Sequence, residues 1–240
     1  MSKFKIDISF YILIITLLLS PFQSHFLYLF LILLIHEAGH IFFIILFKID
    51  IKLLKLYAFG FFLDIDNHNC RFYQDLIIFF GGILFNLISL LILPYNFHRY
   101  IYVIVIVNLL PIYPLDGFMI IKSVLSFIFS YSISLWISSI LSLLSLLILS
   151  LFMFKYLDGF LIFNLICLLV INIKEFKMIN QVLQAFYLRR YLDPPILKKR
   201  KMHMYCNSER GIFKYRLGYL KIGNRNVDES ELLRLKYEGN

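Results

Sequence analysis

Residues 26–47 form an apolar run in which His36, Glu37 and His40 are the strongly polar side chains. At about 1.5 Å per residue, a helix of this length crosses the roughly 30 Å hydrocarbon core of a bilayer. A charged side chain near the bilayer centre costs about 2.5 to 3.5 kcal/mol on insertion scales. Three such groups on one transmembrane helix therefore indicate a functional site.

The spacing of these residues predicts a metal site. Residues four apart lie on one face of a helix, so His36 and His40 can hold one metal ion. Glu37 can then act on a water molecule beside the metal without being a ligand, as in zinc metalloproteases. The HExxH pattern also occurs by chance in soluble helices, but its place in an apolar run makes chance a poor explanation. Gly39 has two interpretations: close approach of another helix, or clearance for a substrate strand.

The composition predicts an all-α polytopic membrane protein. Of the 240 residues, 60% are hydrophobic and 26 are Phe, and the mean hydropathy is +0.80. This balance excludes a soluble domain with a large core. Cys70, Cys167 and Cys206 show no CxxC spacing and are expected to be free thiols. Six apolar segments are predicted to span the membrane, at about 7–20, 26–47, 74–93, 99–122, 131–154 and 158–173.

The basic residues of the short connections orient these spans. With both termini in the cytoplasm, only Arg99 and Lys155 lie outside. The connections on the cytoplasmic side would then contain Lys3, Lys5, Lys48, Lys52, Lys55, Arg71 and Lys122.

The connection between the second and third segments, Ile51 to Asp66, is too apolar for a solvated loop and too short for a span. We expect a hairpin at the membrane, which could receive a substrate strand by β-addition, or else an interfacial packing loop. His68 follows in a polar turn and is expected to be solvated. In the third segment, Asn86 is expected to hydrogen-bond a neighbouring helix, and an active-site role is the second interpretation.

The fourth segment is interrupted by Pro111 and Pro114, which remove two backbone donors from a helix. Such a break is tolerated in a bilayer where the freed backbone is buried in protein or lines a wet cavity. Asp116 follows directly. It is the candidate third metal ligand, and an interfacial aspartate is the alternative.

The basic charge lies at the C-terminus, because residues 174–240 carry 15 Lys and Arg and residues 1–173 carry 9. We predict a membrane domain over 1–173, an amphipathic and basic linker over 174–202, and a small cytoplasmic α/β tail over 203–240. Lys198 to Lys201 favour contact with anionic lipid over nucleic acid. Strands and a short helix from about Asp228 are expected in the tail.

The motifs HEAGH at 36–40 and NLLPIYPLDG at 108–117 together resemble those of the site-2 protease class of intramembrane metalloproteases. The similarity is closest to the stage IV sporulation protease that processes a pro-sigma factor. It implies zinc ligands at His36, His40 and Asp116, a catalytic base at Glu37 and substrate positioning by Asn108. It also implies that residues 203–240 are a shortened remnant of the family's nucleotide-binding CBS domain.

The expected function is therefore zinc-dependent cleavage of a membrane-associated protein, a pro-sigma factor, in the membrane around a forespore. Two alternatives remain open: a protease acting on a transmembrane anti-sigma factor, and a non-proteolytic metal-binding membrane protein. Membrane lipids are expected partners and nucleic acid is not. Inhibitory membrane partners and a homo-oligomer are left open by the sequence.

Overall fold

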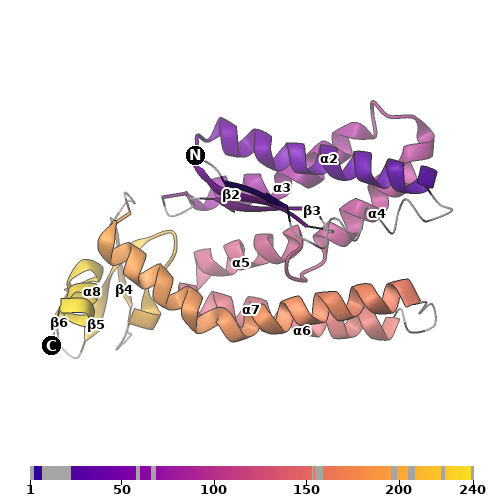
Figure 1. Cartoon of the computed structure of the whole chain (residues 1–240). Coiled ribbons are helices and arrows are strands. Elements are labelled where there is room, and N and C mark those ends of the chain that lie inside the picture. Colours follow the sequence, from indigo (N-terminus) through magenta and orange to yellow (C-terminus); the bar gives the residue numbers. More distant parts are fainter. Residues whose placement is uncertain are drawn as a thin grey trace. The chain divides into compact units, whose positions relative to one another are not determined.

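The computed structural model describes residues 3–6, 23–57, 60–65, 69–152, 154, 159–195, 199–204, 209–222 and 225–238 (Figure 1). The chain divides into two compact units. The first comprises Met1–His68 and Tyr73–Leu109, and the second comprises Asn69–Phe72 and Leu110–Asn240.

The first unit contains helices and a small sheet. Its helical elements are α2 (Gln23–Leu46), α3 (Phe72–Ser89, whose first residue belongs to the second unit), η1 (Tyr95–Phe97) and α4 (His98–Leu109). Its strands are β1 (Lys3–Ile6), β2 (Ile51–Tyr57) and β3 (Gly60–Ile65), in the order β1-β2-β3. The hairpin expected after the second apolar segment is present as the antiparallel pair of β2 and β3. The parallel pairing of β1 with β2 was not predicted, so the all-α expectation is incomplete.

The end of α2 is defined by its backbone. Lys48 has a positive φ of 54°, Ile49 N–H donates to Ile44 O at 3.0 Å, and Lys48 N–H donates to Ile45 O at 3.0 Å. This is the hydrogen-bond pattern of a Schellman motif, which satisfies carbonyls at a helix C-terminus and turns the chain. The helix that carries the two histidines therefore leads directly into the hairpin.

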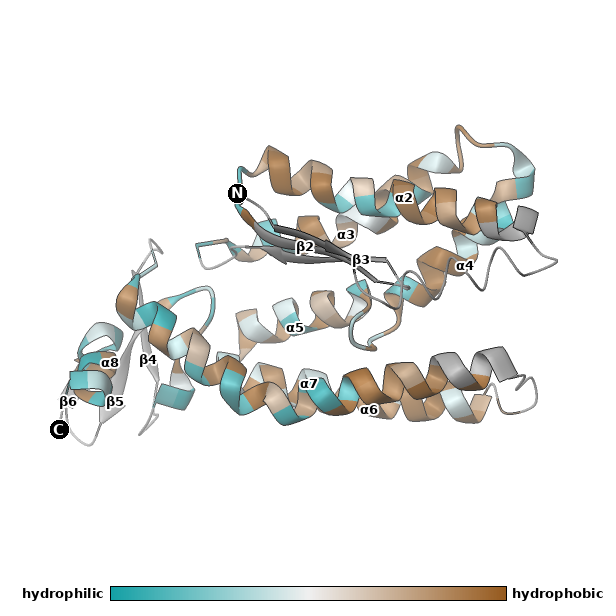
Figure 2. Cartoon of the chain, viewed as in Figure 1, coloured by the Kyte–Doolittle hydropathy of each residue, from teal (hydrophilic) through white to brown (hydrophobic). Residues whose placement is uncertain are grey.

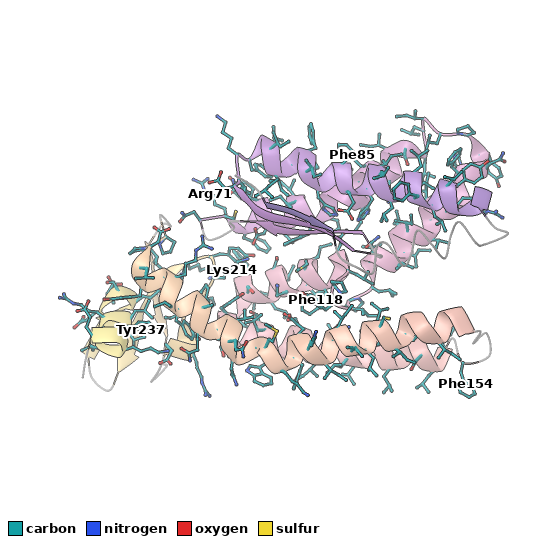
Figure 3. All side chains as sticks on the ribbon, in the orientation of Figure 1. Arg71, Phe85, Phe118, Phe154, Lys214 and Tyr237 are labelled. Carbon is teal, nitrogen blue, oxygen red and sulfur yellow. The ribbon has the colours of Figure 1, made fainter. Side chains whose placement is uncertain are left out.

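Glycines allow α2 and α3 to approach closely. A Cβ built on Gly39 would collide with the carbonyl of Gly81, and one on Gly81 would lie 2.8 Å from Gly39 O. Beside this contact, the ring of Phe43 meets that of Phe85 (labelled in Figure 3) edge to face, with centroids 6.4 Å apart. The helix-approach interpretation of Gly39 is confirmed.

The second unit contains α5 (Asp116–Ile128), α6 (Tyr131–Phe152) and α7 (Gly159–Leu192). α5 packs against α6, and α6 lies beside α7 (Figure 1). α7 has 34 residues, which gives a length of about 50 Å. It runs without interruption through the predicted boundary between the membrane domain and the linker. Hydrophilic residues appear along it toward its C-terminal end (Figure 2).

The C-terminal residues form a small α/β module. Its elements are β4 (Lys199–Met204), η3 (Glu209–Gly211), β5 (Leu217–Ile222), β6 (Arg225–Asp228) and α8 (Glu229–Glu238). β5 pairs parallel with β4 and antiparallel with β6. The module shares one buried core with α6 and α7, formed by Tyr131, Leu135, Ile179, Leu183, Tyr187, Ile212, Val227, Leu232 and Leu233.

A buried ion pair joins α7 to this module. The side chains of Arg190 and Glu229 are 1% and 5% exposed, and their charged atoms are 2.8 Å apart. Arg190 also donates to Phe213 O at 2.5 Å and to Lys214 O at 3.0 Å. Burial lowers the pKa of the Arg190 guanidinium, and the charge of Glu229 opposes that change. Both carbonyls and the carboxylate are thus held by one side chain.

Among the residues that the structure describes, three helices are long and apolar enough to cross a membrane: Leu27–Leu46, Phe72–Ser89 and Tyr131–Phe152. Their outer faces carry large exposed apolar side chains such as Ile45, Leu84 and Ile148. The molecule is therefore a helical membrane protein. The first predicted span, at about 7–20, lies outside the described residues, and the fourth is divided between α4 and α5.

Candidate metal centre

His36 and His40 turn their rings toward each other inside the first unit. Both are buried, at 2% and 7% exposure, and their Nε2 atoms are 3.2 Å apart. Two nitrogen ligands about 2.0 to 2.1 Å from one tetrahedral zinc ion are about 3.3 Å apart. The pair thus has the spacing that a shared metal requires.

The other ring nitrogen of His40 fixes its tautomer. Nδ1 lies 2.7 Å from Ile78 O, a carbonyl that can only accept a hydrogen bond. The proton is therefore on Nδ1, and Nε2 has a lone pair for a metal. Such a hydrogen bond from the second ring nitrogen is the usual way in which a protein orients a histidine ligand.

Asn86 plays the corresponding part for His36. Its side chain is fully buried, with Nδ2 at 3.1 Å from His36 Nδ1, while Oδ1 has no hydrogen-bond partner among the described residues. A side-chain amide can present either its nitrogen or its oxygen to a neighbour. With Oδ1 turned toward Nδ1, the His36 proton lies on Nδ1 and Nε2 has the lone pair. The otherwise unused oxygen fits a metal-binding His36.

Gly82 leaves the space beside the two Nε2 atoms open. A Cβ at this position would lie 2.5 Å from His40 Nε2 and 2.6 Å from His36 Nε2. Any other side chain would occupy the place where a metal ion must sit. Gly82 and Asn86 are four residues apart on α3 and so face the histidines together. The predicted hydrogen bond from Asn86 to a neighbouring helix is confirmed, and its partner is His36 of α2. No role was predicted for Gly82, although its four-residue spacing from Asn86 is visible in the sequence.

The remaining candidates are placed as follows. Glu37 follows His36 on α2 and is 7% exposed. Asn108 lies near the end of α4, where its Nδ2 donates to Ile104 O at 3.1 Å, so its substrate role stays a prediction. Asp116 is the first residue of α5 in the second unit. A carboxylate in the first turn of a helix is stabilised by the helix dipole.

His68, which was expected to be a solvated loop residue, lies outside the described residues.

Asp75 is a buried carboxylate that the sequence analysis did not single out. It is 0% exposed and lies in the first turn of α3. Seven residues separate it from Gly82, a distance of about 10 Å along the helix. It is therefore too far along α3 to act as a ligand at the two histidines.

The fold is similar to that of a solved structure, the site-2 protease from Methanocaldococcus jannaschii. The TM-score is 0.54 at 21% sequence identity, over 71% of this chain and 88% of that chain. No protein-family model matches the chain, and no curated protein matches it in sequence. The similarity thus establishes a site-2-protease-like fold, and the site itself must support the chemistry.

Proposed function

We propose that this chain is a multi-pass intramembrane zinc metalloprotease that cleaves a membrane-associated protein. The observation that carries the proposal is the pair of buried Nε2 atoms, 3.2 Å apart, on a helix of span length. The likeness of the fold to a site-2 protease adds support. A transporter would need polar groups along several spans, whereas this pair belongs to one local site.

The proposed zinc ligands are His36, His40 and Asp116, each offering one ligand atom. Three protein ligands leave a fourth position for water or substrate, as in catalytic zinc sites. Two imidazoles and a carboxylate are a donor set that zinc accepts. Glu37, adjacent to His36, completes the HExxH pattern as a base and not as a ligand.

Zinc, when bound, supplies Lewis-acid activation of a water molecule and of the peptide carbonyl. Glu37 takes the proton from the attacking water and returns a proton to the leaving amine. The carbonyl of Ile78, and Asn86 with its Oδ1 turned toward Nδ1 of His36, would hold both imidazoles in the tautomer in which Nε2 offers its lone pair to the metal. The apolar surroundings limit entry of other water.

The substrate must reach the site in an extended form, because an intact helix keeps its carbonyls in hydrogen bonds. β3 pairs with β2 on one side only within the described sheet, so its other edge could add a substrate strand. Asn108 would position that strand. The motifs favour a pro-sigma factor as substrate, in a stage IV sporulation protease, and a transmembrane anti-sigma factor is the alternative.

The proposed topology has six spans and both termini in the cytoplasm, in the membrane that surrounds a forespore. Its support is the distribution of Lys and Arg in the connections. The basic residues 198–201 would contact anionic lipid, and residues 203–240 would be a shortened CBS-like module. Inhibitory membrane proteins and a second copy of the chain are further partners to test.

The test is co-expression with a candidate pro-sigma factor, with processing followed by immunoblot. The wild type should shorten the substrate, and Glu37→Gln should abolish cleavage while zinc remains bound. Glu231→Gln, at an exposed position of α8, is the control and should cleave normally. Cleavage by Glu37→Gln at the wild-type rate would refute the mechanism. Zinc binding without cleavage of either substrate class would favour the non-proteolytic alternative.

A further inference from the structure

The turn between α4 and α5 is held by side chains from two other helices. Tyr113 lies in this turn between Pro111 and Pro114, and the Tyr113–Pro114 peptide bond is cis. Tyr113 N–H donates to Ser142 Oγ of α6 at 2.8 Å. Asn172 Nδ2 of α7 donates to Tyr113 O at 2.8 Å. Both backbone groups of one turn residue are thus bound by side chains.

The three residues form a closed ring of hydrogen bonds. The Ser142 hydroxyl donates to Asn172 Oδ1, and its oxygen accepts from Tyr113. Asn172 Nδ2 also donates to Leu168 O of its own helix at 2.8 Å. Ser142 is 1% exposed and Asn172 is 3% exposed. Every N–H and O–H donor of the two side chains is used, and each side-chain oxygen accepts one hydrogen bond, which suits polar groups in an apolar environment.

This ring lies only three residues from Asp116. The connecting backbone is short and bonded: Leu115 N–H donates to Ile112 O at 2.8 Å, and Phe118 N–H donates to Leu115 O at 3.2 Å. The aromatic ring of Tyr113 packs edge to face on Phe118 of α5 (labelled in Figure 3), with centroids 5.2 Å apart. A shift of the backbone at Tyr113 would therefore move the first turn of α5 and its carboxylate.

We propose that Ser142 and Asn172 are positioning residues for the metal centre. They bind the N–H and the C=O of Tyr113, in the turn where the two prolines break the helix, and thereby fix the direction of the Asp116 carboxylate. The inference rests on the proposed function, because it assumes that Asp116 is a zinc ligand. It assigns a function to one of the buried serines of α6.

The hydrogen-bonded ring of Tyr113, Ser142 and Asn172 could instead serve only to join α6 and α7. Metal coordination distinguishes the two roles, because a bond that only joins the helices would change stability and leave the ligand geometry intact. The matched control is Ser138, one turn before Ser142. It is also 1% exposed, and its hydroxyl donates to Leu135 O of its own helix.

The experiment uses the full chain in lipid nanodiscs, with zinc affinity measured by competition with a chelator. Ser142→Ala and Asn172→Leu should each weaken zinc binding about 10- to 100-fold, the usual effect of losing a residue that orients a ligand. In the double variant, zinc affinity should fall no further than in the more weakly binding of the two single variants. Ser142→Thr retains the hydroxyl and should restore binding, and Ser138→Ala should leave it unchanged.

Cobalt substitution adds a spectroscopic measurement. The intense visible bands of four-coordinate Co²⁺ should weaken in Ser142→Ala, since the carboxylate no longer points at the metal. Wild-type affinity and spectra in both Ser142→Ala and Asn172→Leu would overturn the inference and leave the proposed function standing. Equal losses in Ser142→Ala and Ser138→Ala would also overturn it. A wild-type protein that binds neither zinc nor cobalt would overturn the proposed function as well.

Discussion

Asn86 on α3 places its side-chain amide 3.1 Å from Nδ1 of His36 on α2, on the opposite side of that ring from the nitrogen that faces His40. The contact joins two helices through groups that are both at most 2% exposed. A polar contact of this kind between spans orients the imidazole as well as joining the helices.

Replacing Asn86 with Leu should weaken zinc binding about 10- to 100-fold, because His36 would lose the acceptor that holds its proton on Nδ1. Chelator competition on the purified protein measures the change. Ser89→Ala is the matched control, since Ser89 is buried on the same helix and its hydroxyl donates to the backbone carbonyl of Asn86. Unchanged affinity in Asn86→Leu would mean that the amide only joins the helices.

Gly82→Ala should abolish zinc binding, because the new methyl group would lie 2.5 Å from His40 Nε2. Metal content per protein chain, measured by atomic absorption, tests this. Gly81→Ala provides the comparison: its methyl group would meet the backbone of Gly39, so it should lower thermal stability first. If Gly82→Ala retained a full equivalent of zinc, the metal would have to lie elsewhere.

Asp116→Ala should lower zinc occupancy as strongly as His36→Ala or His40→Ala, since a site with three protein ligands loses much of its affinity with any one of them. His98→Ala is a suitable control, because His98 is the first residue of α4 and its imidazole contacts a backbone carbonyl, Leu93 O. Metal analysis of the four variants under one set of conditions is sufficient. Full occupancy in Asp116→Ala would exclude this carboxylate as the third ligand.

Arg190→Met should destabilise the C-terminal module by about 3 to 5 kcal/mol, because it leaves the Glu229 carboxylate buried without its cation. Limited proteolysis and hydrogen exchange of residues 209–238 report the loss. The control is Arg234→Ala, which breaks the exposed pair with Glu238 and should leave the stability of the module nearly unchanged. Equal protection in both variants would show that the apolar core alone holds the module.

The sequence by itself determined the features that depend on local geometry. The four-residue spacing of His36 and His40 places both imidazoles on one face of any α-helix, and apolar length alone predicts the spans of α2, α3 and α6. The prolines at 111 and 114 end α4 wherever that helix lies. The hairpin of β2 and β3 is also local, because its strands are joined by a short connection.

Only the tertiary structure decided which distant groups meet. Asn86 lies 50 residues from His36, and Asn172 lies 59 residues from Tyr113. Such pairs leave no periodic trace in a sequence, because an asparagine in a span can bond to many neighbours. The role of Gly82 is visible only as space between two helices. The C-terminal module joins the core of α6 and α7 for the same reason, because burial depends on packing between segments far apart in the chain.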